Sequence, residues 1–198
     1  GMQGGMGGPT QGGVEALSRA VFLRRVHQNT SYEELVNEVG VFGPMETVRI
    51  DYERGEAFVA FLDSQAAAML LQEKPTIGLH GQTAELSWGK AKPLSQRLAN
   101  AVQHGATRNL YLGNLPINLP QEALVEGFRP FGPIESVRVM RNTGTGYVNF
   151  TAIESALAAR EQLATVRVCD VFGAFCAPGE HEAEMQVTFT SAQQNCRR

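Results

Sequence analysis

Four short segments in the first half of the chain are apolar or alternate apolar with polar residues. Alternation with a period of two is typical of a strand with one buried face, and short apolar runs between turn residues are also typical of strands. Pro75 and Gly78 are expected to break the chain before the last segment. The segments that we predict as strands are residues 20–23, 47–51, 56–61 and 83–88.

Two stretches between these strands have helical spacing. Apolar residues between positions 35 and 39 recur on one side of a helix, and Thr30 and Glu33 have the spacing of a capping box at its start. A second predicted helix covers residues 64–73, with Asp63 as its N-cap. The resulting order, strand-helix-strand-strand-helix-strand, is the split βαβ or ferredoxin-like arrangement.

The second half of the chain repeats the first without a gap. Phe22 and Tyr111 are 89 positions apart, and so are Phe58 and Tyr147. The block Phe-Gly-Pro-Met-Glu-Thr-Val-Arg-Ile from Phe42 aligns with Phe-Gly-Pro-Ile-Glu-Ser-Val-Arg-Val from Phe131. An ungapped match that includes loops indicates two copies of one folded unit. In the second copy we predict strands at 109–112, 135–140, 146–150 and 185–189, and helices at 121–129 and 152–163.

The repeat predicts an α+β protein with two tandem ferredoxin-like βαββαβ domains joined by a partly helical linker. A helix from Ser95 to His104 would carry an apolar stripe, so it either rests on one domain or fixes the two domains relative to each other. Residues 164–184 are expected to form an extra hairpin or a packed loop. The expected division is 1–17 (disordered Gly-rich tail or tag remnant), 18–90 (first domain), 91–107 (linker), 108–191 (second domain) and 192–198 (tail).

Composition narrows the classes of function. The net charge of −3 argues against a protein that grips nucleic acid mainly through phosphates. Cys169, Cys176 and Cys196 do not suggest a disulfide framework, which favours reducing, intracellular conditions. Cys169, Cys176 and His181 also lack the paired spacing of a zinc site, and no catalytic constellation appears. We therefore expect no metal, no cofactor, no membrane span and no enzymatic activity.

Strand parity places aromatic rings on the sheet faces that the helices leave open. The apolar residues on either side of Tyr147 suit the core, so Tyr147 points to the opposite face, and Tyr111 does so on the adjacent strand. Phe22 and Phe58 occupy the matching places in the first copy. Exposed rings at neighbouring strand positions are costly unless a partner stacks on them.

Two arginines at equivalent positions are predicted to share these open faces. Arg49 and Arg138 alternate with apolar neighbours on the second strand of each copy. A guanidinium there can contact phosphate or stack on a base. The alternative is a surface arginine paired with an acidic neighbour such as Glu46, Asp51 or Glu135.

The segments around the rings resemble two motifs of RNA-recognition motifs (RRMs). Leu-Tyr-Leu-Gly-Asn-Leu at 110–115 looks like their RNP2 hexamer, and Gly-Thr-Gly-Tyr-Val-Asn-Phe at 144–150 is similar to most of their RNP1 octamer. Residues 21–26 and 54–61 match the same motifs more weakly. Together the two resemblances cover nearly everything from about residue 18 to residue 191.

The resemblance implies binding of single-stranded RNA on the open sheets. Residues 87–90 and 105–113 are also similar to fungal RNA-binding proteins of the negative-regulator-of-differentiation type. The family implies that each motif stacks two or three bases on its aromatics. It also implies mRNA as the partner, post-transcriptional regulation as the role, and the cytoplasm, the nucleus or both as the location.

Residue by residue, the resemblance assigns roles in RNA binding. Phe22 and Tyr111 match the RNP2 stacking position, and Phe58 and Tyr147 match the central RNP1 position. The polar candidates are selected on different grounds. Arg54 matches the basic residue that opens RNP1, Arg141 would replace the basic residue missing at Thr143, and Asn114 keeps the family asparagine. Lys90 and Lys92 follow the last strand of the first copy, where RNA could leave the sheet, and Arg49 and Arg138 complete the predicted set.

Departures from the motifs make the second copy the better RNA platform. Glu56 and Thr145 stand where RNP1 usually has another aromatic, and Glu56 adds negative charge. Arg25 replaces the asparagine that the second copy keeps. The alternative function is therefore a protein-interaction module, in which the first RRM binds a protein partner and only the second binds RNA. Trp88 is expected to pack at the edge of the core rather than stack on RNA.

Overall fold

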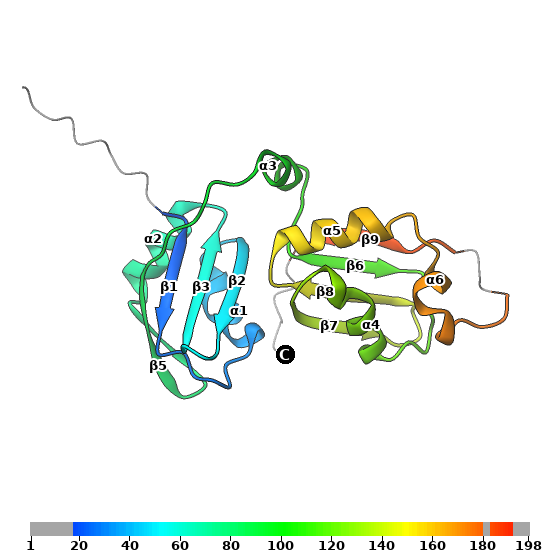
Figure 1. Cartoon of the computed structure of the whole chain (residues 1–198), viewed down its shortest axis with the longest axis horizontal. Coiled ribbons are helices and arrows are strands. Elements are labelled where there is room, and N and C mark those ends of the chain that lie inside the picture. Colours follow the sequence, from blue (N-terminus) through cyan, green and yellow to red (C-terminus); the bar gives the residue numbers. More distant parts are fainter. Residues whose placement is uncertain (1–17, 180–182, 192–198) are drawn as a thin grey trace, which may run out of the picture.

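The computed structural model describes residues 18–179 and 183–191, so the predicted tails at 1–17 and 192–198 lie outside the described residues. The first copy folds into an antiparallel sheet of order β2-β3-β1-β5-β4 with helices on one face (Figure 1). Its elements are β1 (Ala20–Arg24), α1 (Tyr32–Val39), a 3₁₀ turn (Gly40–Phe42), β2 (Met45–Asp51), β3 (Glu56–Phe61), α2 (Ser64–Glu73), β4 (Thr76–Leu79) and β5 (Gln82–Trp88).

The second copy repeats this arrangement in an antiparallel sheet of order β7-β8-β6-β9. The prediction of two tandem βαββαβ units with a partly helical linker is therefore confirmed. The elements from the linker onward are α3 (Gln96–Gln103), β6 (Asn109–Gly113), α4 (Gln121–Phe128), a 3₁₀ turn (Arg129–Phe131), β7 (Ile134–Met140), β8 (Thr145–Phe150), α5 (Ile153–Leu163), α6 (Val168–Phe172), a 3₁₀ turn (Gly173–Phe175) and β9 (Gln186–Thr190).

Each unit has its own hydrophobic core between the sheet and its helices. Leu23 and Phe61 belong to the first core, and their repeat partners Leu112 and Phe150 belong to the second. All four side chains are fully buried. The apolar parity of the central strands thus fixes one face of each sheet against helices and leaves the alternate residues on the other face.

Strand β4 shows that one sequence expectation was wrong. Pro75 and Gly78 were expected only to interrupt the chain, but Gly78 lies inside a strand that forms a hairpin with β5. Ile77 and Leu79 on either side of it are buried in the core. Because β4 lies at the sheet edge, a glycine costs less there than it would in a central strand.

The described part of the segment at 164–184 does not form the extra hairpin, and it packs on the second core as short helices rather than as a loop. Its described part forms helix α6 and a 3₁₀ turn, and Arg167 and Glu184 form an isolated antiparallel bridge. Phe172 of α6 packs on α4 at Gly127, where an added Cβ would lie 2.9 Å from the Phe172 ring. Apolar residues of this segment had no counterpart in the first copy, so the repeat could not place them.

The first helix begins one residue later than the capping box predicted. Ser31, not Thr30, is the N-cap of α1, and its hydroxyl accepts a hydrogen bond from the backbone N–H of Glu34 at 3.0 Å. Thr30 is instead buried beneath the helix start. The expected cap of α2 is confirmed, because the Asp63 carboxylate accepts from the Gln65 N–H at 2.9 Å.

Gly55 and Gly144 close the same loop in the two copies. Both have left-handed backbones, with φ of 63° and 64°. Their carbonyls accept hydrogen bonds from Val26 and Leu115, the residues after β1 and β6, at 2.9 and 2.8 Å. At Gly144 an added Cβ would also lie 2.8 Å from the Leu115 carbonyl oxygen. Glycine is therefore required to join the two RNP-like segments.

The linker helix α3 fixes the two domains relative to each other, which is the second of the two roles predicted for it. Leu98 and the neighbouring Ala106 are buried with Ile153 and Leu157 of the second unit. Leu62, which follows β3 of the first unit, packs against the same cluster. Arg97 adds ion pairs to Glu154 and Glu161 of α5. The apolar stripe therefore joins side chains from both units in one small core.

The expectation that the cysteines remain unpaired was wrong for two of them. Cys169 and Cys176 form a disulfide that spans α6 and the 3₁₀ turn after it. Cys196, like His181, lies outside the described residues. Spacing alone did not reveal the pair, because the intervening residues fold into a compact turn.

Two further expectations concern absent features. Across the described ranges, no helix combines the length and the apolar character needed to cross a bilayer. In the same part of the chain, no group of three or more histidine, cysteine or acidic side chains is arranged to hold a metal ion.

Candidate nucleic-acid interface

Tyr111 and Tyr147 lie side by side on the open face of the second sheet. They are direct cross-strand partners on β6 and β8. Their ring centroids are 5.6 Å apart with an edge-to-face interplanar angle of 66°. Both side chains are half-buried. Each ring supports the other and keeps part of its surface toward solvent, which suits stacking on a flat base.

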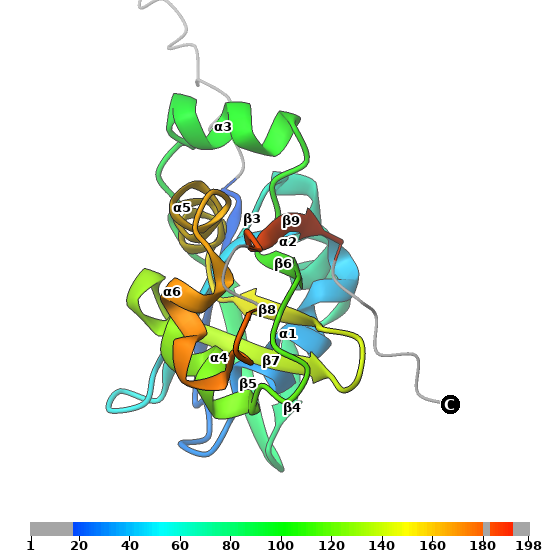
Figure 2. The ribbon, with the colours of Figure 1, turned by 90° about the vertical axis from the view of Figure 1, so that its right-hand side faces the viewer.

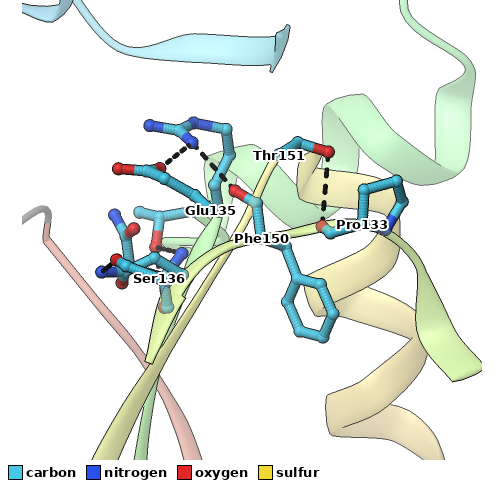
Figure 3. Close-up of polar contacts among 9 residues, drawn as sticks. Pro133, Glu135, Ser136, Phe150 and Thr151 are labelled. Carbon is cyan, nitrogen blue, oxygen red and sulfur yellow. Dashed lines mark hydrogen bonds and ion pairs between the residues drawn. The ribbon is translucent and has the colours of Figure 1, made fainter. Parts of the chain in front are cut away.

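Basic and polar side chains surround this pair. Arg138 is the partner of Tyr147 on β7 and is exposed, and Arg141 is exposed at the start of the following loop. Asn149, next to the rings on β8, donates from Nδ2 to the Ser136 hydroxyl at 3.0 Å (Figure 3). The second sheet therefore combines two rings, two cations and an ordered amide on the face opposite its described helices.

Asn114 has a structural role that the motif alone did not show. Its backbone is left-handed, with φ of 62°, and its side-chain Nδ2 donates to the Glu184 carbonyl at 2.9 Å. Arg25 occupies the equivalent position with φ of 60°. Its guanidinium lies 3.5 Å from the Glu85 carboxylate on the exposed surface. In both copies this position ends the first strand, and contact with RNA remains a prediction.

Phe22 and Phe58 are cross-strand partners on the first sheet. They line a shallow depression of about 720 Å³ together with Arg49, Tyr52 and Glu56. The guanidinium of Arg49 lies 4.8 Å from the centroid of Phe58. Arg49 therefore makes a cation–π contact on the open face, as its strand parity predicts, rather than the alternative pairing with an acid.

Arg24 is a functional candidate that sequence reasoning missed. It shares the strand parity of Phe22, and its guanidinium lies 5.7 Å from the centroid of that ring. It is also the cross-strand partner of Glu56. The same parity argument that selected Phe22 could have found Arg24. Both rings of the first sheet therefore already have a cation against them.

On the first open face, the ring of Phe58 lies close to the start of the chain that leaves β5. Ala20 and Ala60 have the parity of the open face, yet they are 0% and 1% exposed. A Cβ on Gly89 would lie 3.3 Å from the Ala20 Cβ and 3.4 Å from the ring of Phe58. The Gly89 N–H also donates to the Ala20 carbonyl at 3.0 Å. This bond continues the β1–β5 pairing by one residue, so the ring of Phe58 extends across β1 toward Gly89.

The remaining basic candidates lie at the margins of the first sheet. Arg54 is exposed in the loop after β2, with its Nε 3.8 Å from the Asp51 carboxylate. Lys90 and Lys92 are exposed just beyond Gly89. Trp88 shares the parity of the buried Ala84, but it is 47% exposed at the end of β5. The rings, Arg24 and Arg49 are thus brought together, whereas Arg54 and the two lysines lie around them.

An equivalent ion pair lies at the sheet ends of both copies, buried in the second copy and partly exposed in the first. Arg108 donates to the Glu135 carboxylate at 2.7 Å and to the Phe150 carbonyl at 2.8 Å (Figure 3). Arg19 makes the equivalent contacts with Glu46 and Phe61, at 3.0 and 2.6 Å. Glu46 and Glu135, offered above as partners of Arg49 and Arg138, are therefore occupied elsewhere.

Burial changes the pKa of Glu135 in the ion pair of the second copy. Desolvation raises the pKa of Glu135 above its usual value, and the charge of Glu33 on α1 acts in the same direction. Arg108 opposes both effects through its charge and its hydrogen bond. The pair therefore fixes the start of β7 against the end of β8, and a counter-ion is needed to hold the carboxylate there.

This fold, together with the paired rings at the RNP-like positions, is typical of RNA recognition motifs. The family model of the RNA recognition motif matches residues 21–85 and 110–169. The chain therefore belongs to the RNA recognition motif family and carries two copies of the domain. The tandem-RRM prediction is confirmed.

Several curated relatives have similar sequences. The "Meiotically up-regulated gene 24 protein" of Schizosaccharomyces pombe is 31% identical over 72% of this chain and 22% of its own length. The "RNA-binding protein MRN1" of Saccharomyces cerevisiae is 29% identical over 73% of this chain and 25% of its own length. The chain thus spans about a quarter of these relatives. Neither name refers to a negative regulator of differentiation, so that finer resemblance stays a prediction.

A solved two-domain structure was also matched. The first two RRM domains of the yeast poly(U)-binding protein Pub1 cover 87% of this chain and 99% of that one, at 19% identity and a TM-score of 0.34. At this level the likeness adds nothing to the family assignment.

Proposed function

We propose that this chain is a single-stranded RNA-binding module whose main platform is the open face of the second sheet. The observation that carries the proposal is the pair of cross-strand tyrosines, 5.6 Å apart on an uncovered sheet face. Membership of the RRM family, and similarity to the RNA-binding protein MRN1, support RNA as the ligand. Stacking on aromatic rings contributes roughly 1–3 kcal/mol per base.

Charge supports stacking over phosphate binding as the main source of affinity. The chain has a net charge of −3, and the two exposed cations beside the tyrosines are Arg138 and Arg141. Two arginines can neutralise only a few phosphates. We therefore propose that ring and base-edge contacts carry most of the affinity, with mRNA as the natural RNA and with post-transcriptional regulation, cytoplasmic, nuclear or both, as the role.

The first sheet is proposed as a weaker RNA platform. Arg49 already lies over Phe58, and one edge of the same ring lies close to Gly89. Asp51, Glu53 and Glu56 also line its depression, which opposes a phosphate backbone. These observations favour the second candidate function for this face alone, in which it binds a basic protein segment while the second sheet binds RNA. Neither role requires enzymatic chemistry.

Salt dependence of RNA binding tests the proposed mechanism. Selection from a random RNA pool against the full chain supplies a ligand, and its affinity is then titrated over increasing salt. For single strands, log K falls by about 0.7 per neutralised phosphate for each unit of log salt, so two contacts predict a slope of roughly −1.4. A slope several times steeper would contradict a stacking-based platform, and the absence of any selected RNA would reject RNA binding.

A further inference from the structure

The two open faces point to opposite sides of the molecule. In Figure 1 helices α4 and α5 stand in front of the second sheet, whereas α1 and α2 lie behind the first. Figure 2, turned by 90°, agrees, because α4 and α5 lie to the left of their sheet and α1 and α2 to the right of theirs. Contacts of α5 with β2, and of α1 with β7, fit the same arrangement.

A backbone connection holds the units in this orientation. The Val48 N–H on the outer strand β2 donates to the Thr151 carbonyl of the second unit at 2.8 Å. Thr47 and Ala152 form an isolated antiparallel bridge beside it. The residues after β8 therefore continue the edge of the first sheet. Rotation of one unit against the other would break this pairing.

Apolar burial reinforces the connection. Leu98, Ile153 and Leu157 are each 5% exposed or less, in a cluster that also includes Leu62 of the first unit. Helix α3 therefore closes the top of the interface as a packed element rather than a loose tether. Separating the units would expose these side chains to water, at a cost of about 25 cal/mol per Å² of apolar surface.

From this geometry we propose that the chain binds two separated RNA segments, one on each side, so that the RNA between them loops around the protein. The proposal rests on the proposed function and adds the class of RNA ligand. A continuous strand that lies on the tyrosines of the second sheet cannot pass directly onto Phe22 and Phe58, because the packed units stand between the two faces. The ligand is therefore a strand with two short sites joined by a long spacer, or two separate strands.

The length of the spacer controls affinity in this arrangement. A tether that cannot reach both sites gives no second contact, whereas one that matches the span converts the second binding event into an intramolecular one. A common platform formed by two neighbouring sheets would show the opposite behaviour, with the greatest gain at short spacers. The profile of affinity against spacer length therefore separates opposed faces from adjacent ones.

The experiment uses the full chain and two sites obtained by selection. The variant F22A/F58A selects a short site for the second face, and Y111A/Y147A selects one for the first face. The two sites are then joined by unstructured spacers of roughly 4, 15 and 40 nucleotides and titrated against the unmodified chain. Spacers of the same lengths attached to one site alone serve as matched controls.

The expected result has two parts. The two unlinked site RNAs bind together with a stoichiometry of two RNAs per protein, and joining them raises affinity about 100-fold with the longest spacer but not with the shortest. An equal gain with the shortest spacer would overturn the proposal, and so would no gain at any length. A stoichiometry of one RNA would overturn it while leaving the proposed function intact, whereas failure to bind either site would reject the proposed function itself.

Discussion

The double substitution Y111A/Y147A will weaken RNA binding by about 30-fold or more. Each ring supplies stacking worth roughly 1–3 kcal/mol per base, and about 1.4 kcal/mol corresponds to a factor of ten in affinity. The two rings touch each other, so removing both also avoids compensation by the remaining one. The measurement is a titration of the selected RNA against both chains.

Matched variants separate lost stacking from lost structure. The substitutions Y111F and Y147F keep the rings and remove only the hydroxyls, so they will retain most of the affinity. F22A/F58A makes the same change at the repeat positions of the first sheet, where cations already cover the rings, and will cost less. Unchanged binding in a folded Y111A/Y147A chain would reject the tyrosine platform.

The substitution R108A will destabilise the chain by about 3–5 kcal/mol, the cost of leaving a buried charge without its partner. The Arg108 and Glu135 side chains are only 5% and 8% exposed, so the carboxylate would stay largely shielded from solvent after it loses its donor. The repeat provides its own control. R19A removes the equivalent contacts, together with a hydrogen bond to the Lys92 carbonyl, from a pair that is 18% and 23% exposed, so it will cost roughly 1–2 kcal/mol, between the surface and buried cases.

Urea unfolding of both variants, followed by circular dichroism, measures these losses. In the R108A variant, part of the lost unfolding free energy will be recovered at acid pH. The pKa of Glu135 is raised in the folded state, so there it keeps its proton at pH values where the unfolded chain has lost it. By linkage, stability then falls as pH rises through that window and returns as pH falls. Equal losses in R108A and R19A would show that burial does not govern the pair.

The sequence could predict the repeated features because they depend on local spacing. Strand parity around Tyr147 and Phe58 separates core residues from open-face residues, and the 89-residue repeat applies the same pattern twice. The N-cap role of Asp63 depends only on residues at the start of its own helix, α2. These features use neighbours in sequence, so they can be inferred before any tertiary contact is known.

Features that depend on distant contacts could not be predicted in this way. Arg108 finds Glu135 only because β6 and β7 begin at the same side of the sheet. The choice of Ser31 over Thr30 as N-cap depends on how the chain enters the core. The hydrogen bond from the Val48 N–H to the Thr151 carbonyl joins the two units. The sequence repeat describes each unit separately, so it gives no information about contacts between them.

The most direct test of the account is the observation of nuclear Overhauser effects between the full chain and its selected RNA. The account predicts contacts from base protons to the ring protons of Tyr111 and Tyr147. Contacts confined to α4, α5 or the loops, with no signal from either ring, would contradict binding on the open face of the second sheet.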